Sequence, residues 1–141
     1  PTYIGCFVCE EWLTFSNFKA WMMTQDWEGN QLDKDLLVEG NKKYSPQTCV
    51  FINNVVNTFI TNGKSSKKSE YPMGVSFHKK TQKLRVRCSN PVTGKAEYLG
   101  SCDSPEEGHA IWLNRKKEIA LMLAEQQENP VIKSALIDRY K

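Results

Sequence analysis

The chain has 141 residues, of which 40% are hydrophobic and 25% are charged, and its formal net charge is +3. This length suits one domain or two small ones. No apolar run is long enough to span a bilayer, and residues 1–3 lack the basic start and apolar core of a signal peptide. We therefore expect neither a membrane span nor a secretory leader. The sequence begins with Pro1 rather than Met, as a fragment or a processed chain would.

The cysteines indicate the redox setting. There are five, an odd number without a repeated spacing, which favours a reduced, cytoplasmic protein over a disulfide framework. Cys6 and Cys9 form a lone C-x-x-C pair, and a zinc site would require two further ligands. Cys49 supplies a third, and no fourth is evident. The alternatives are a zinc-stapled module on these three residues and small buried cysteines without a metal.

The first predicted element is a helix over residues 11–22. Trp12, Phe15, Phe18 and Met22 recur there at helical spacing. The spacing predicts an amphipathic helix whose aromatic stripe faces the core. Stacking of these aromatic rings on nucleic-acid bases is the alternative.

A strand, a loop, a second strand and a helix are predicted over residues 31–60. The first strand begins at Gln31, the loop contains Gly40 and Pro46, and the helix begins at about Asn53. This order, with the stretch Leu-Asp-x-x…Gly-x-x-x-Tyr-x-Pro-x-x-Cys, resembles the HNH (histidine–metal finger) nucleases of phages and bacteria. The resemblance covers roughly residues 8–60. It implies a ββα unit that cleaves phosphodiester bonds with a divalent metal.

The resemblance also assigns roles by position. The general-base histidine of that family corresponds to Lys34, between Asp33 and Asp35. The family's middle Asn corresponds to Thr48, and the last position of its motif, on the helix, corresponds to Asn57. Lysine is protonated at neutral pH and is a poor base. Oxygen atoms of Asp33, Asp35 and Asn57 are nevertheless suitable ligands for Mg²⁺. The implied catalytic residues are Asp33, Lys34 and Asp35, and the implied metal ligands are Asp33, Asp35 and Asn57. The alternative is that the two acids are ordinary turn residues on a decayed scaffold.

A small, polar and basic stretch follows at residues 61–69 and is typical of a linker. It opens a concentrated block of positive charge, because residues 61–100 hold nine Lys and Arg against two acids, a net of +7. Such concentration suits a polyanion, since each neutralised phosphate releases condensed counterions. We therefore expect the linker to contact DNA phosphates independently of the base sequence, through Lys64, Lys67 and Lys68.

Three short strands are predicted over residues 71–102 by alternation of period two. One face is apolar and must be covered, whereas the other is basic and aromatic and is expected to stay open. The predicted core side holds Val75, Phe77, Leu84, Val86, Cys88 and Leu99, and the predicted open side holds Ser76, His78, Arg85, Arg87, Ser89 and Tyr98.

The covering element is a helix that starts at Ser104, with Pro105 at its first position and Glu107 closing a capping box. A further helical tail follows Pro130, which breaks the long helix. We expect the tail to pack back on a domain, with a dimer contact as the alternative. The predicted apolar stripe of the long helix comprises Ala110, Leu113, Lys117, Ala120 and Leu121, with Ile111, Trp112 and Ile119 beside it.

A second resemblance rests on motifs that lie between residues 74 and 110. The steps Gly-Val-Ser-Phe-His, Lys-Leu-Arg-Val-Arg, Tyr-Leu-Gly and Ser-Pro-Glu-Glu resemble the ethylene-response-factor (Apetala-type) DNA-binding domain over about fifty residues. That family reads the DNA major groove with a three-stranded sheet backed by a helix. Plant members have Arg where Ser76 and His78 stand, and Trp where Leu84 and Tyr98 stand, so their DNA preference does not transfer. The expected DNA-binding residues are Ser76, His78, Lys80, Lys83, Arg85, Arg87, Ser89, Tyr98, Lys64, Lys67 and Lys68.

Together these patterns predict an α+β chain with an HNH-like unit at 1–60, a linker at 61–70, and an Apetala-type domain with a helical tail at 71–141. Phage proteins of the HNH kind often join these two units in this order. The expected function is a DNA-binding, homing-type endonuclease-like protein of a phage, working on double-stranded DNA with Mg²⁺ in the host cytoplasm. The alternative is a non-catalytic DNA-binding regulator or accessory protein.

Overall fold

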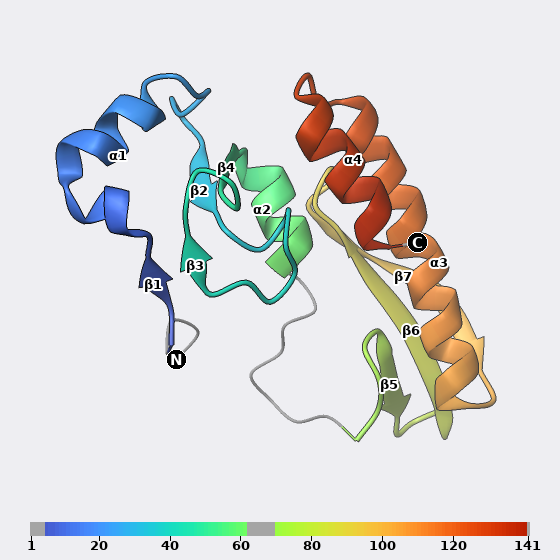
Figure 1. The fold of residues 1–141 in the computed structure, drawn as a ribbon. Helices are drawn as coiled ribbons and strands as arrows, with labels where there is room; N and C mark the ends of the chain where they lie inside the picture. The colour runs from blue at the N-terminus through green and yellow to red at the C-terminus, as the bar shows by residue number, and fades with distance from the viewer. Residues whose placement is uncertain (1–4, 62–69, 141) are drawn as a thin grey trace.

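The computed structural model describes residues 5–61 and 70–140 (Figure 1). The fold is of the α+β class, as predicted, and its largest sheet packs against its longest helix. No helix in the described ranges is long and apolar enough to cross a membrane. In chain order the elements are β1 (Phe7–Val8), the 3-10 helix η1 (Glu10–Leu13), α1 (Phe15–Met22), β2 (Gln31–Asp33), β3 (Lys43–Tyr44), β4 (Val50–Ile52), α2 (Asn54–Thr61), β5 (Val75–His78), β6 (Lys83–Asn90), β7 (Lys95–Cys102), α3 (Pro105–Glu125) and α4 (Pro130–Arg139).

The first half contains a ββα unit at the predicted place. Strands β2 and β4 pair antiparallel, and α2 follows directly, while β1 pairs with β3 in parallel. Asn53 starts α2 because its Oδ1 accepts a hydrogen bond from the backbone N–H of Val56 at 2.8 Å. Val56, Phe59 and Ile60 form the buried side of this helix.

Helix α1 corrects one expectation. The predicted continuous helix is divided by Thr14 into η1 and α1, and α1 contains no buried residue. Trp12 is buried, but Phe15 is 71% exposed. The aromatic rings contact one another, with Trp12 and Phe18 packed edge to face. Periodicity correctly placed the aromatic residues on one side, but it carried no information on whether another element would cover them.

Strands β5, β6 and β7 form one antiparallel sheet with β6 in the centre. Val75 pairs with Val86, and Leu84 pairs with Cys102. Paired residues share a face, so these side chains form the apolar face. Helix α3 covers it, and its start is the predicted one, because Ser104 Oγ accepts a hydrogen bond from the Glu107 N–H at 3.1 Å.

The buried face of α3 differs from the predicted stripe. Ala110 is exposed and Leu121 is 51% exposed, whereas Lys116 is 2% exposed. The predicted stripe contained Lys117 rather than its neighbour Lys116, so the expected face was rotated relative to the observed one. The buried residues of α3 are Gly108, Lys116, Ile119, Ala120, Leu123 and Ala124.

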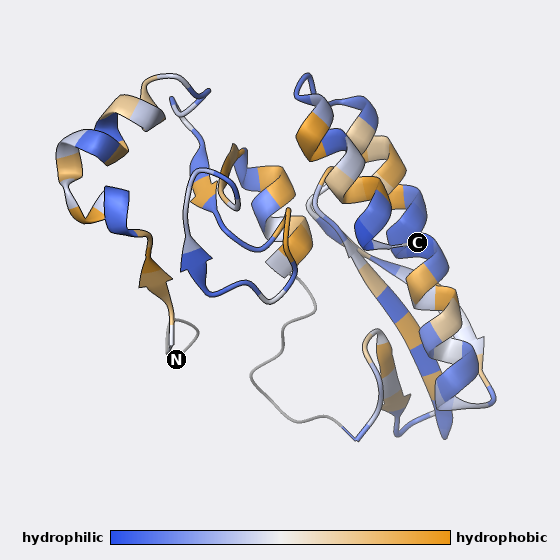
Figure 2. Cartoon of the chain, viewed as in Figure 1, coloured by the Kyte–Doolittle hydropathy of each residue, from blue (hydrophilic) through white to orange (hydrophobic). Residues whose placement is uncertain are grey.

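One hydrophobic core joins the two halves of the chain. Val56 and Phe59 of α2 pack in the same cluster as Cys88 of β6, Leu123 of α3 and Leu136 of α4. Figure 2 shows hydrophobic residues on α2 and on the two C-terminal helices. The tail therefore packs back on the chain as expected. The predicted division at 61–70 separates two segments that share this core.

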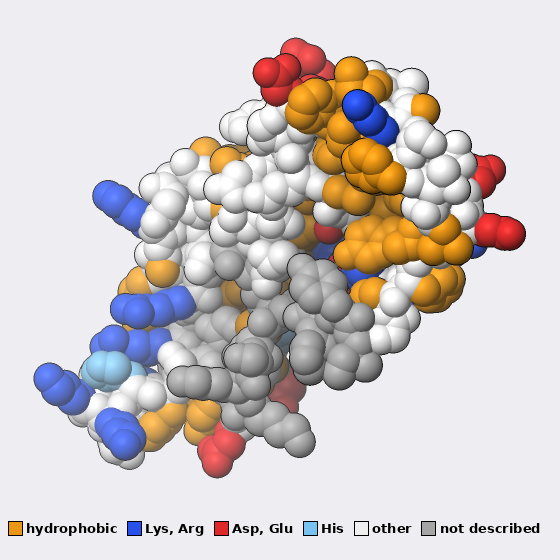
Figure 3. All heavy atoms as spheres, turned by 90° about the vertical axis from the view of Figure 1, so that its left-hand side faces the viewer, with side chains coloured by type: hydrophobic (Ala, Val, Ile, Leu, Met, Phe, Trp, Pro, Cys, Tyr) orange, Lys and Arg blue, Asp and Glu red, His pale blue; other side chains and the backbone are white. Residues whose placement is uncertain are grey.

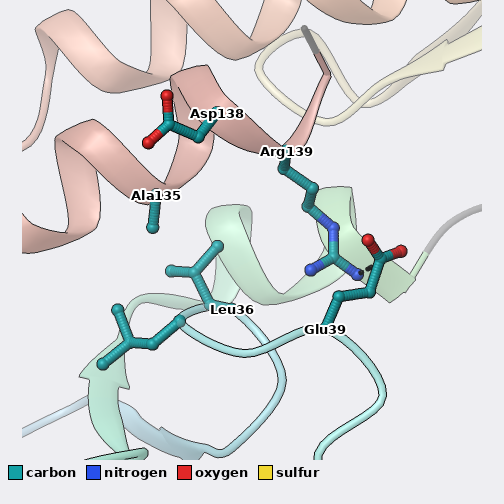
Figure 4. A pocket seen from close by; sticks show the side chains of 6 residues that line it. Leu36, Glu39, Ala135, Asp138 and Arg139 are labelled. Carbon is teal, nitrogen blue, oxygen red and sulfur yellow. Dashed lines mark ion pairs between the residues drawn. The ribbon is translucent and has the colours of Figure 1, made fainter.

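Arg139 connects α4 to the segment between β2 and β3 through an ion pair and a hydrogen bond (Figure 4). Its side chain is 7% exposed, its Nη2 lies 3.8 Å from Glu39 Oε1, and its Nη1 donates a hydrogen bond to the Asp35 backbone oxygen at 3.2 Å. One backbone oxygen and one carboxylate thus interact with a charge that would be costly to bury alone. This contact holds the β2–β3 segment against the C-terminal helices.

Gly74 supplies a stability prediction with a matched control. A Cβ at Gly74 would lie 2.3 Å from Trp112 Cγ, whereas Gly94 has a similar positive φ, +72° against +87°, and nothing within 4 Å of a Cβ. Gly94→Ala is expected to cost about 1–2 kcal/mol of unfolding free energy from backbone strain. Gly74→Ala should cost about 1–3 kcal/mol more through overpacking. Urea unfolding of both variants measures the difference, and equal losses would contradict the contact with Trp112.

Candidate nucleic-acid interface

The outer face of the β5–β6–β7 sheet, which we call the open face, carries the predicted DNA-binding residues. Strand register sets this arrangement, because each pair of opposed residues points to the same side. Three rows follow one another along β6, and their exposed side chains are polar, basic or aromatic. The rows are Ser76–Arg85–Ser101, His78–Lys83 and Arg87–Tyr98, and Ser89 pairs with Ala96 beyond them.

Ser101 on this face was not predicted. Strand β7 has a register shift opposite Val86 and Arg87, where Gly100 pairs with Val86 and Tyr98 pairs with Arg87. The additional residue of this β-bulge, Leu99, returns Ser101 to the open face. Gly100 has a φ of +114°, a value that favours glycine. This glycine within a strand pattern was the available signal for the bulge.

Arg85 and Tyr98 are arranged by their own contact. The Arg85 guanidinium carbon lies 5.6 Å from the Tyr98 ring centroid, within cation–π range. The Tyr98 hydroxyl lies 3.2 Å from Ser101 Oγ. Tyr98 is still 55% exposed. These contacts restrict the side-chain conformations of both residues. The pair therefore presents a flat ring and a planar cation to solvent at a reduced entropic cost of binding.

The β5–β6 turn adds further cations at the end of the open face. His78 Nδ1 lies 3.1 Å from Thr81 Oγ1, and Lys79 and Lys80 are exposed in the turn. Gln82 adopts a positive φ of +56°, which closes the turn. Figure 3 shows Lys and Arg side chains gathered with a His side chain at the lower left. Lys64, Lys67 and Lys68 lie outside the described residues.

The covered face contains an ion-pair network below the β6–β7 hairpin. Arg115 of α3 donates to both carboxylate oxygens of Glu97, at 2.6 and 3.0 Å, and Asn90 also donates to Glu97 at 3.0 Å. These hydrogen bonds from Arg115 and Asn90 lower the pKa of Glu97 to about 2. The only carboxylate among the residues of β6 and β7 thus faces α3, away from the open face.

The predicted catalytic residues lie close together at the end of β2. Asp33 Oδ2 accepts hydrogen bonds from the N–H groups of Asp35 at 3.0 Å and Leu36 at 2.6 Å. Lys34 is 6% exposed, and its Nζ lies 3.0 Å from Asp35 Oδ2. Both acids therefore already have hydrogen-bond or ion-pair partners within this segment.

This arrangement does not fit the implied Mg²⁺ site. Burial raises the pKa of Asp33, and its two backbone hydrogen bonds oppose that shift. Burial lowers the pKa of Lys34, but Asp35 outweighs it, and the net pKa is raised. Lys34 is thus an ammonium beside a carboxylate that would serve as ligand. Asn57 lies on α2, and the described residues contain no cluster of three His, Cys, Asp or Glu able to hold a metal.

No disulfide joins the five cysteines, all of which lie among the described residues. Cys49, Cys88 and Cys102 are buried, while Cys6 and Cys9 are partly exposed. Burial raises the pKa of the Cys49 thiol, so the protonated form is favoured there. A zinc ion on Cys6, Cys9 and Cys49 stays a hypothesis, to be tested by metal analysis of the purified protein.

Comparison with known proteins adds no assignment. No family model, curated protein or solved structure matches this chain.

Proposed function

We propose that this protein binds double-stranded DNA through the open face of its three-stranded sheet, with that face in the major groove. One observation carries the proposal: Arg85, Arg87, Lys83 and Tyr98 share a solvent-facing side of a sheet whose other side is covered by α3. Arginine binds guanine edges through two hydrogen bonds, and the B-DNA major groove admits a two-stranded ribbon.

Charge supports a polyanionic partner. The open face and its β5–β6 turn contribute Lys79, Lys80, Lys83, Arg85 and Arg87, while Glu97 points to α3. Such local concentration brings several cations to one DNA backbone and also speeds encounter with it. A DNA partner and five cysteines that form no disulfide fit a reducing cytoplasm, which we propose as the location.

A salt titration tests the binding. A fluorescently labelled duplex of mixed sequence should bind, and log K should fall with log[salt] with a slope of about −0.9 per neutralised phosphate. Five to seven contacts would give a slope of about −4.5 to −6.3. A duplex RNA of the same sequence should bind more weakly, because side chains do not reach into its deep, narrow major groove. No binding, or a slope near zero, would overturn the proposal.

Phosphodiester cleavage is a second candidate function. The observation that favours it is the ββα order of β2, β4 and α2, which the HNH-like resemblance implies. Against it stand the Lys34–Asp35 ion pair and the engaged carboxylate of Asp33. We therefore propose a DNA-binding protein in which this unit serves as scaffold, with cleavage as the alternative to be tested.

A nicking assay separates the two. Supercoiled plasmid is incubated with the protein and Mg²⁺ or Mn²⁺, and binding is followed in parallel. We expect binding without nicking, because an ammonium cannot accept a proton from water. Nicking that disappears in Asp33→Asn but persists in Asp26→Asn, a control at an exposed acid before β2, would establish cleavage instead.

A further inference from the structure

A cavity of about 190 Å³ lies between α2 and the β6–β7 hairpin, and we call it the junction pocket. Thr58 lines it from α2, Ser89 and Ala96 line it from the paired strands, and Lys95 lines it from the start of β7. None of the described residues that line it is acidic.

The junction pocket adjoins the open face. Ser89 and Ala96 form the last row of that face before the hairpin turn. A ligand that covers Arg85 and Arg87 and continues along β6 therefore reaches the pocket next. Helix α2 lies on the other side of the pocket. Helical spacing places four polar residues on the face of α2 opposite its buried side: Asn54, Asn57, Thr58 and Thr61.

Helix α2 is fixed in this position by the core. Lys116 Nζ of α3 donates a hydrogen bond to the Phe59 backbone oxygen at 3.0 Å and lies 3.9 Å from the Phe59 ring centroid. Phe59 itself is fully buried in the shared core. The core packing of the chain before residue 62 and after residue 69 therefore sets the distance between α2 and the hairpin.

The chemistry of the lining suits a phosphate. Two hydroxyls, of Thr58 and Ser89, and the ammonium of Lys95 are hydrogen-bond donors. The Asn90 side chain is already engaged, donating to Glu97 and accepting from the Val92 N–H at 3.0 Å. A single phosphate group matches one cation and a few neutral donors, whereas an apolar ligand would leave these donors unsatisfied.

We propose that a backbone phosphate of the bound DNA occupies the junction pocket, so that α2 and the sheet contact the same duplex. This inference rests on the proposed DNA binding. The phosphate contact adds Thr58 and Lys95 to the interface.

The test compares four variants on the same mixed-sequence duplex. Lys95→Ala should reduce the magnitude of the salt slope by about 0.9, the contribution of one phosphate. Thr58→Ala should weaken binding about 2- to 10-fold, as for loss of one hydrogen bond. The controls Lys133→Ala and Ser134→Ala remove the same groups from exposed positions on α4 and should change neither quantity.

The outcomes separate this inference from the binding proposal. If the wild type does not bind duplex DNA, both fail. If the wild type binds with a steep slope while Lys95→Ala matches Lys133→Ala and Thr58→Ala matches Ser134→Ala, the phosphate contact fails alone. Thr58→Glu is a second variant that does not depend on a small loss: its carboxylate should repel the phosphate and weaken binding more than Thr58→Ala. Thermal unfolding of each variant checks that the fold is intact.

Discussion

Replacing both Arg85 and Arg87 with alanine is expected to lower the affinity for a preferred duplex by about 2–6 kcal/mol, since each good base contact contributes about 1–3 kcal/mol. Both residues lie on the open face, where Arg85 is already oriented by Tyr98. The preferred duplex is obtained by selection from a random library, and affinity is measured at fixed salt. Losses on scrambled duplexes should be smaller, because base contacts contribute nothing there.

The matched control removes two cations elsewhere. Lys117→Ala with Lys133→Ala changes the net charge by the same amount, from positions on α3 and α4 outside the open face. This control should leave discrimination between preferred and scrambled duplexes unchanged. Equal losses for both double variants, on both duplexes, would mean that the face attracts DNA by charge alone and reads no bases.

The second large effect concerns the buried lysine of α3. Lys116 is 2% exposed among Phe59, Trp112 and Tyr140, and burial lowers its pKa to about 8 from an ordinary 10.5, with Arg139 adding to the shift. Between these pH values the unfolded chain binds the proton and the folded chain does not, so raising the pH favours folding. The wild type should gain roughly 3 kcal/mol of stability relative to Lys116→Met between pH 7.5 and 10.5.

The comparison with Lys116→Met is necessary because other groups titrate in the same window. Burial raises the pKa values of Cys49 and Cys102, and these thiols favour the unfolded chain as the pH rises. Cys49 and Cys102 are present in both proteins and cancel in the difference, which therefore reports Lys116 together with Cys88, the thiol that interacts with it. Lys117→Met is the matched control, since it removes the neighbouring ammonium from a partly exposed position. The same pH-dependent difference in both variants would rule out a specific role for the buried amine.

The sheet and most residues of its two faces could be predicted because local pattern determines them, but Phe77, predicted on the core side, is 41% exposed. Alternation along residues 84–89 separated the apolar from the basic side. The cap of α3 could be identified from the four consecutive residues that begin at Ser104. Both features depend on neighbours in sequence. The helices were harder to predict, because the same periodicity describes α1, which contains no buried residue, and α3, which buries a lysine.

The parts that could not be predicted depend on contacts distant in sequence. The ion pair of Lys34 with Asp35 lies within one segment, but its burial does not follow from that segment alone. Phe59 and Lys116 are in contact although they are 57 positions apart in the sequence, and no short sequence pattern predicts this contact. The basic stretch after α2 indicated a linker, most of which lies outside the described residues, and no local pattern indicated that the segments before and after it share one core.

The bulge in β7 has a geometric consequence for what the open face can match. It lies between the Ser76–Arg85–Ser101 row and the Arg87–Tyr98 row, in the middle of the surface. A bulge sharpens the right-handed twist of the strands, so side chains on its two sides are turned relative to each other. We therefore expect a twisted rather than a planar surface. A twisted surface can follow the winding of a helical groove, whereas a flat partner, such as a lipid headgroup layer, would match it less well.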